Sequence, residues 1–218
     1  MKDRSDGSQH VPCFTIKWAT SCWEQQQASS LRRQVFCREQ GLFTECDLDE
    51  RDHYAQSLVA VTNIGGWMDR VVGTVRIHED RPRQWAGSRL AVEPCFRRNS
   101  HIGSALIRLA VSSAHALGCD RFIAQVQKPN ERLFQRLHWE SLAEHHIRDR
   151  LHVLMRADLD RYPPYFHPAA GFVIRNSRYC PPAPTPSAIL DRPDLVSLFH
   201  RQLENAQTLS GAPRRVAG

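Results

Sequence analysis

Apolar and polar residues alternate along this chain with two periods, one typical of strands and one typical of helices. The strand period, with apolar side chains at every second position, predicts strands over 14–18, 57–63, 70–78, 89–92, 121–127 and 152–158. The helical period predicts helices over 23–40, from Gly103 to about Leu117, and from Pro129 to about Leu137. Gly41 follows the first helix as a C-terminal glycine should, and Gly65-Gly66 predicts a hairpin turn. Strands and helices therefore share one α/β domain.

The composition changes after Tyr162, where Pro163-Pro164 opens a proline-rich stretch. Proline fixes the backbone and removes a hydrogen-bond donor, so regular helices and central strands are not expected there. We therefore predict a flexible N-terminus over 1–12, a folded domain over 13–162, and a proline-rich extension over 163–218 that holds one possible helix at 188–207. A chain of 218 residues is long enough for such a domain to bury a sizeable core.

The segment 89–118 carries the most informative local pattern, a strand, a basic turn and then an amphipathic helix that opens at Gly103. The start of a helix leaves backbone N–H groups without partners in the helix and carries a partial positive charge. A basic turn with a glycine at that point is a ready site for a phosphate or pyrophosphate. The same pattern also fits an ordinary strand-turn-helix whose arginines are solvated.

The turn Arg98-Asn99-Ser100-His101-Ile102-Gly103 is similar to the pyrophosphate loop of the GNAT acyltransferases, Arg/Gln-x-x-Gly-x-Gly/Ala. The resemblance implies the GNAT fold, a mixed central sheet flanked by helices and splayed between its fourth and fifth strands. It also implies acetyl-CoA or another acyl-CoA as co-substrate. His101 stands at the first glycine position, where a β-carbon disfavours positive φ. The cofactor-binding candidates are Val92, Arg97, Arg98, Ser100, His101, Ile102, Gly103, Ser104 and Asn130.

Two further blocks extend the resemblance over residues 14 to 160. Asn130 matches the family position that touches the pantetheine arm, whereas Phe134 stands where the family often has a Tyr general acid, so that role is not carried over. The order Arg-x-x-Val-Phe, an acidic run and Gly-x-x-Arg resembles acyl-homoserine-lactone synthases, with Arg32 or Arg33 and Arg76 at that pattern's basic positions. It is still more similar to the GNAT domains encoded in bacterial nitrilase clusters and linked to nitrogen starvation.

Transfer of an acyl group to an amine requires a deprotonated amine, a stabilised oxyanion and release of the thiolate. The candidate bases are Glu39, Asp47, Asp49, Glu50, Asp52, His78 and Glu79. Asp49 and Asp52 match acidic positions of the lactone-synthase pattern, and Arg76 matches a basic one, so an ion-pair network is expected. We take Glu39, Asp49, Asp52 and Arg76 as the catalytic and acceptor-site candidates. The opposing interpretation is a solvated acidic loop.

Charge and cysteine usage narrow the class of protein. The net charge of +6 is spread over scattered arginines without a long basic run, which argues against nucleic acid and agrees with an anionic partner such as CoA or acyl carrier protein. No apolar stretch approaches the ~20 residues of a membrane span. The seven cysteines form no Cys-x-x-Cys pair, which favours reduced thiols and a cytoplasmic bacterial enzyme. The paired His145 and His146 lack ligands at metal spacing, so no metal is expected.

The sequence therefore predicts an N-acyltransferase that moves an acetyl or longer acyl group from acyl-CoA to a small amine in a ternary complex. Two alternatives stay open. One is an autoinducer-type synthase that uses acyl carrier protein and S-adenosylmethionine. The other is a module that binds acyl-CoA without turning it over.

Overall fold

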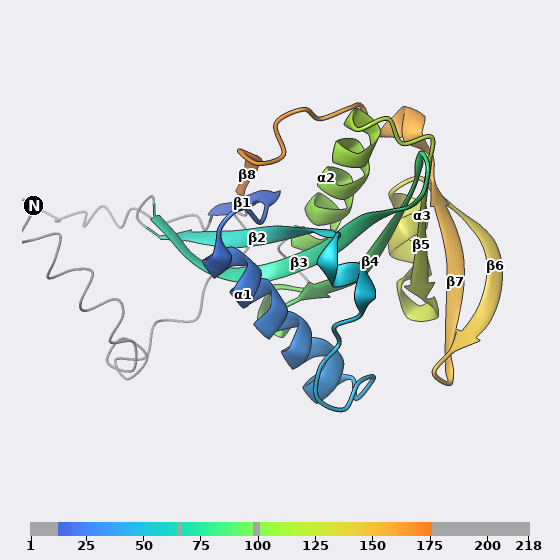
Figure 1. Cartoon of the computed structure of the whole chain (residues 1–218), viewed down its shortest axis with the longest axis horizontal. Helices are drawn as coiled ribbons and strands as arrows, with labels where there is room; N and C mark the ends of the chain where they lie inside the picture. The colour runs from blue at the N-terminus through green and yellow to red at the C-terminus, as the bar shows by residue number, and fades with distance from the viewer. Residues whose placement is uncertain (1–12, 65–66, 98–100, 176–218) are drawn as a thin grey trace, which may run out of the picture. The chain divides into compact units, whose positions relative to one another are not determined.

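An eight-stranded mixed sheet forms the frame of the computed structural model, which describes residues 13–64, 67–97 and 101–175 (Figure 1). The strands lie in the order β6-β7-β5-β4-β3-β2-β1-β8, and β4 and β5 are the parallel pair within a ladder that is otherwise antiparallel. Their bounds are β1 Cys13–Trp18, β2 Gln56–Ile64, β3 Trp67–Arg81, β4 Gln84–Val92, β5 Arg121–Gln127, β6 Trp139–Ile147, β7 Arg150–Ala157 and β8 Phe172–Arg175.

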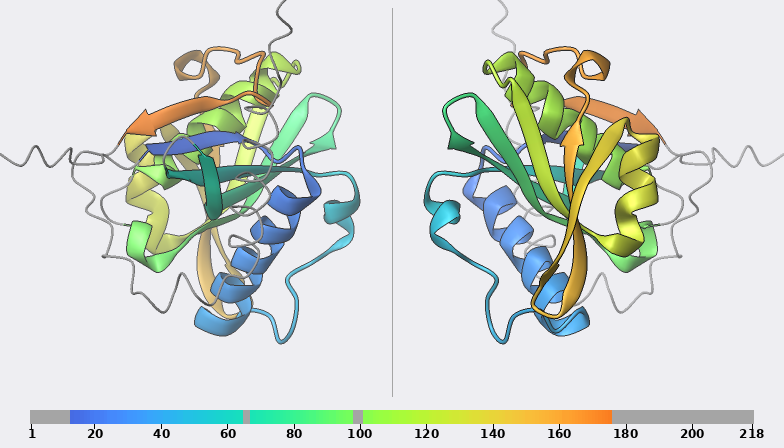
Figure 2. Two further views of the ribbon diagram at one scale, coloured as in Figure 1. Left: turned by 90° about the vertical axis from the view of Figure 1, so that its left-hand side faces the viewer. Right: turned by 90° about the vertical axis from the view of Figure 1, so that its right-hand side faces the viewer.

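Helices cover both faces of this sheet. The first, α1 (Cys22–Arg32), lies on one face, and α2 (Ile102–Ala116) and α3 (Glu131–Arg136) lie on the other (Figure 2). Ser21 starts α1 with a capping box, in which its hydroxyl accepts the Glu24 N–H at 3.2 Å while the Glu24 carboxylate accepts the Ser21 N–H at 3.0 Å. The helix predicted over 23–40 is confirmed in extent, but its second half, Arg33–Glu39, is π-helical. Gly41, at φ +63°, ends it as predicted.

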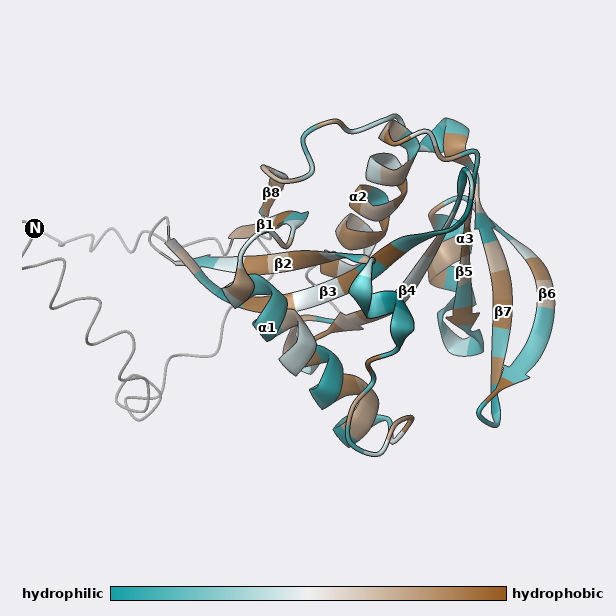
Figure 3. Ribbon diagram, viewed as in Figure 1, coloured by the Kyte–Doolittle hydropathy of each residue, from teal (hydrophilic) through white to brown (hydrophobic). Residues whose placement is uncertain are grey.

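Two apolar clusters fill the space between the sheet and its helices, and brown ribbon in Figure 3 marks the apolar residues of both. The larger cluster joins α2 to β1, β2, β3 and β5, and the smaller one joins α1 to β2 and β3. Gly73 lets α2 approach the sheet closely, because a β-carbon there would lie 2.6 Å from the Cγ2 atom of Ile102. Helix α2, which follows the predicted cofactor loop, is thus fixed against the core.

The sheet opens between β4 and β5. Their parallel pairing covers Gln84–Gly87 against Arg121–Ala124 and stops there, although β4 continues to Val92 and β5 to Gln127. Arg89, at φ +56°, marks an irregular point in β4, and the pairing of β3 with β4 shifts register between Thr74 and Arg76. The splay predicted between the fourth and fifth strands is therefore confirmed, as is the GNAT fold.

The structure adds two strands to those predicted. β6 carries His145 and His146 on an outer edge of the sheet, and exposed residues make up most of it, so its apolar pattern is weak. β8 lies within the range assigned to the proline-rich extension and pairs with β1 at the opposite edge. The folded domain therefore continues past the expected boundary at residue 162. The predicted flexible N-terminus and the possible helix at 188–207 lie outside the described residues.

Candidate active site

A cavity of about 810 Å³ occupies the opening between β4 and β5 and extends toward both faces of the sheet. Its inner wall is apolar and comes from α2, β5, α3 and the start of β6. The residues of this inner wall are Ile107, Ala110, Phe122, Phe134 and Trp139. Its outer wall is polar and comes from the 42–51 loop, β3 and β4, with Asp49, Arg51, Arg76, His78 and Arg89.

Aromatic packing holds the inner wall in place. Phe134 and Trp139 meet edge to face with ring centroids 5.0 Å apart, and the Trp139 Nε1–H donates to the Tyr162 hydroxyl oxygen at 3.0 Å. The Tyr162 hydroxyl donates in turn to the Leu137 carbonyl, and burial raises the pKa of Tyr162. Tyr162 is therefore a structural group. Phe134 lines the cavity and carries no acidic proton.

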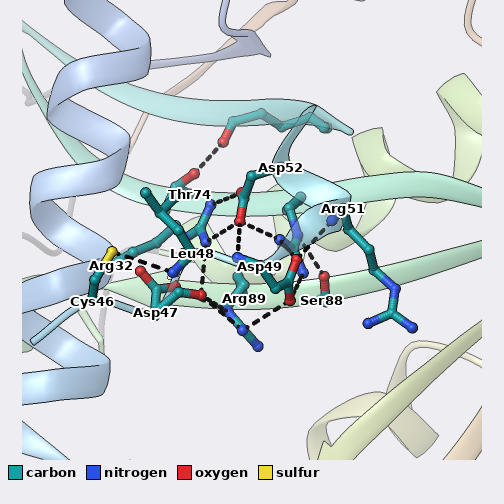
Figure 4. Close-up of polar contacts among 12 residues, drawn as sticks. Arg32, Cys46, Asp47, Leu48, Asp49, Arg51, Asp52, Thr74, Ser88 and Arg89 are labelled. Atoms are coloured by element: carbon teal, nitrogen blue, oxygen red, sulfur yellow. Dashed lines mark hydrogen bonds and ion pairs between the residues drawn. The ribbon is translucent and has the colours of Figure 1, made fainter. Parts of the chain in front are cut away.

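Three aspartates of the 47–52 loop meet three arginines beneath the outer wall of the cavity (Figure 4). Arg32, from the end of α1, is buried and donates to both Asp47 and Asp52, with Nε–Oδ2 at 2.7 Å and Nη1–Oδ1 at 2.6 Å. The Asp49 backbone N–H also donates to Asp52, at 2.9 Å. The acidic loop is thereby fastened to α1.

The other two arginines come from the sheet. Arg76 on β3 reaches Asp49 and Asp52 through Nη1, each at 2.7 Å, and its Nε donates to the Ser88 hydroxyl at 3.0 Å. Arg89 on β4 contacts Asp47 at 3.0 Å and Asp49 at 3.1 Å. The ion-pair network expected from the sequence is therefore present. The sequence did not indicate Arg89 as a member, since only the backbone turn at that residue aims it at the loop.

The charges of this network set the protonation of its acids. Burial alone would raise the pKa of Asp49 and Asp52, but hydrogen bonds and charge from Arg76, Arg89 and Arg32 outweigh it and lower both. Both carboxylates therefore stay ionised and engaged near neutral pH, and a carboxylate with a depressed pKa is a weak proton acceptor. Their contacts fit a role in shaping the loop better than direct proton transfer.

Glu39 lies in a separate pair. At the end of the π-helical turn its carboxylate meets the Arg97 guanidinium with two contacts, at 2.5 and 2.6 Å, and the Arg97 Nε donates to the Val92 carbonyl at 2.8 Å. The hydrogen bond from Arg97 lowers the pKa of Glu39. An acceptor-site candidate and two cofactor candidates thus contact one another at the end of β4.

The described part of the predicted pyrophosphate loop begins at His101, directly before α2. His101 adopts φ +56° in spite of its β-carbon, so the left-handed turn forms without the usual glycine. Among the described residues, a β-carbon at Gly103 would contact the Val92 side chain, at an ordinary van der Waals distance of 3.9 Å. Ile102 is buried in the core, and Asn130 lines the cavity. Arg98 and Ser100 lie outside the described residues.

His78, one of the candidate bases, lies on the polar wall of the cavity and is only 4% exposed. Its Nδ1 is, within the described ranges, the one buried side-chain nitrogen or oxygen without a hydrogen-bond partner. Burial lowers the pKa of His78, and the positive charges of Arg51 and Arg76 lower it further. The ring is therefore a neutral imidazole near neutral pH.

The comparisons with known proteins agree with this fold. The model of the acetyltransferase (GNAT) family matches residues 15–139, more than half of the chain, and the chain belongs to that family. It is accordingly an acyltransferase enzyme. A comparison with curated protein sequences found no match.

Solved structures share the fold at low sequence identity. A putative N-acetyltransferase from Lactobacillus plantarum is similar with a TM-score of 0.59 and 17% identity, over 66% of this chain and 97% of that one. Escherichia coli ElaA gives 0.55 and 16%, over 66% and 98%. FeeM, an N-acyl amino acid synthase from uncultured soil microbes, gives 0.55 and 11%, over 70% and 94%.

Within the ranges 13–64, 67–97 and 101–175, no group of three or more His, Cys, Asp or Glu residues is placed to hold a metal ion. None of the helices in those ranges is long and apolar enough to cross a membrane.

Proposed function

We propose that this enzyme transfers an acyl group from acyl-CoA to the nitrogen of a small amine. The observation that carries the proposal is the cavity between β4 and β5, which joins an apolar inner wall to a polar outer wall across the opened sheet. A thioester needs such a passage, because its acyl chain is apolar while the attacking nitrogen arrives from water.

The residues at the end of β4 and the start of α2 fit the anionic end of CoA. Backbone N–H groups of the first turn of α2 would face a diphosphate favourably, and no described side chain crowds Gly103 more closely than Val92, at 3.9 Å from a β-carbon there. Val92, Arg97, His101, Ile102, Gly103 and Ser104 would form this end with Arg98 and Ser100, and Asn130 would contact the pantetheine arm.

The reaction itself needs little from the protein beyond positioning. The neutral amine attacks the thioester carbonyl, so that a C–N bond forms and the C–S bond breaks. The nitrogen loses one proton and the departing thiolate gains one, which gives an amide and a free thiol. Phe134 offers no proton to the sulfur, so solvent or the amine itself supplies it. Asp49, Asp52 and Arg76 would hold the acceptor loop, with Glu39 beside the cofactor end.

A thiol-release assay tests the proposal. Purified protein is incubated with acetyl-, hexanoyl- and decanoyl-CoA and a panel of primary amines, and the free thiol and the amide product are measured together. Amide and thiol formed in equal amounts would support N-acyl transfer. Thiol without amide, or lactone release with acyl carrier protein and S-adenosylmethionine, would contradict it.

A further inference from the structure

The polar wall of the cavity carries two groups that the ion-pair network leaves without partners. Arg51 follows Asp49 in the loop and lines the cavity, and no ion pair or hydrogen bond of its guanidinium is found in the described part of the chain. Figure 4 shows the side chain of Arg51 turned away from the cluster of ion pairs. His78 lies on the same wall with its buried Nδ1 unpartnered.

The network fixes the backbone from which Arg51 projects. The Asp49 carboxylate accepts the Arg51 N–H at 3.1 Å, and Asp52 closes the turn by accepting the Asp49 N–H at 2.9 Å. Asp49 and Asp52 are held in turn by Arg76. The backbone beneath the exposed Arg51 side chain is therefore fixed before a ligand binds, so that only the side chain has to be ordered on binding.

The charges that line the whole cavity leave a small positive excess. Within the network three aspartates face three arginines, so the negative charge of Asp49 is already neutralised by arginine. The remaining charged groups of the cavity are Arg51, Arg148 and Asp80. A simple amine has no partner for Arg51, whereas a carboxylate on the acceptor would pair with that guanidinium.

We infer that the acceptor is an amine that also carries a carboxylate, an amino acid, and that Arg51 and His78 form the subsite for this carboxylate. Arg51 presents a planar fork of N–H donors that matches a carboxylate, and a neutral imidazole adds a hydrogen bond without a charge of its own. Asp80 also lines the cavity and would be available to the acceptor's ammonium group. This inference rests on the proposed function and names its acceptor class.

Paired substrates test the inference. The twenty amino acids are assayed singly with the best acyl-CoA, and the preferred one is then compared with its amide and its decarboxylated amine. We expect kcat/KM for the amino acid to exceed that of both analogues at least about tenfold. Equal or better turnover of the carboxylate-free amines would overturn the inference while leaving N-acyl transfer intact.

Variants locate the subsite. Arg51→Gln and His78→Asn should raise KM for the amino acid about tenfold or more and should affect the decarboxylated amine much less. Arg136→Gln, an exposed arginine of α3 that does not line the cavity, is the matched control and should behave as wild type. Equal loss for both substrates would show a structural role and would contradict the assignment.

A binding measurement separates this inference from the reaction. Calorimetric titration of the amino acids into protein saturated with CoA needs no turnover. Binding that Arg51→Gln abolishes would support the subsite even if no amide forms, in which case the proposed function alone fails. Absence of binding by every amino acid, in wild type with CoA bound, would overturn the subsite.

Discussion

Single residues set the chemistry at both ends of the cavity, and Gly103 is the clearest case at the cofactor end. Gly103→Asp would place a carboxylate beside the proposed diphosphate, and we expect the Kd for CoA to rise about tenfold or more through like-charge repulsion. Gly103→Ala is the matched control, because its β-carbon meets its nearest neighbour, Val92, at 3.9 Å and fits without strain. Calorimetric titration of CoA gives both constants. If the two variants bind CoA equally well, the diphosphate does not lie at this turn.

Asp52 makes the stability of the protein depend on pH. Its pKa in the folded protein lies below the ordinary value of about 3.9. The stabilisation is therefore fully present above that value and is lost as the pH falls toward the folded pKa. At pH 7 we expect Asp52→Asn to lower the free energy of unfolding by about 2 to 3 kcal/mol, somewhat under the figure for a fully buried pair.

Urea unfolding at pH 7 and pH 3 measures this effect. Wild type should lose more stability between the two pH values than Asp52→Asn, because the variant has already lost the ionised partner of Arg32 and Arg76. Asp149→Asn, exposed on the turn between β6 and β7, is the control and should follow wild type. Parallel curves for wild type and Asp52→Asn would show that the network does not stabilise the fold.

At the scale of elements, β8 depends on a close approach that the sequence did not indicate. Gly171 adopts φ +68°, and a β-carbon there would lie 2.1 Å from the Ile16 carbonyl oxygen. Gly171→Ala should therefore move β8 from its place beside β1 and lower the free energy of unfolding by about 3 kcal/mol or more. Gly41→Ala has a similar φ, +63°, but no neighbour within 4 Å, and should cost only about 1 to 2 kcal/mol.

Thermal unfolding of the two variants compares them directly. The difference between them isolates the contact with β1, since the left-handed conformation is common to both. Equal destabilisation by the two substitutions would mean that β8 adds nothing to the stability of the domain.

The elements that the sequence predicted are those whose pattern is local. The spacing of apolar residues on α2, the capping glycine after the first helix and the alternation in β5 each act within a few residues, and all three appear in the structure. β8 was missed because its four residues gain their partners from β1, far away in the chain. The π-helical turn over Arg33–Glu39 could not be told from an α-helix by the spacing of apolar residues at a period of 3.6.

At the scale of the whole molecule, the site was predictable in its residue types and much less so in its pairings. The acids and Arg76 were found through a resemblance in motif order, and they do meet. The partners that neutralise them could not be predicted, because Arg89 reaches the loop through the fold of the sheet. The same limit hid the pairing of Glu39 with Arg97 across 58 residues of chain.

Beside the cavity, segments that are distant in the chain meet at Phe43 and Arg148. The Phe43 ring lies between two guanidinium groups, with Arg89 at 4.6 Å and Arg148 at 4.2 Å from its centroid. Arg148 also donates to the Leu42 carbonyl at 2.6 Å, and Arg150 donates to the Gln40 carbonyl at 2.6 Å. The turn between β6 and β7 is thereby fastened to the 42–51 loop, which forms part of the outer wall.

Arg148→Gln should loosen this closure without unfolding the domain, because the residue is exposed and a cation–π contact at such a site contributes about 0.5 to 1 kcal/mol. Hydrogen exchange should become faster over 42–49 and 147–150, and KM for the acceptor should rise while the Kd for CoA stays unchanged. Arg132→Gln, an exposed arginine on α3, controls for the loss of a surface charge. A variant that exchanges as slowly as wild type over 42–49 would show that the turn does not hold the loop. The order of the outer wall would then come from the ion pairs of Arg32, Arg76 and Arg89 alone.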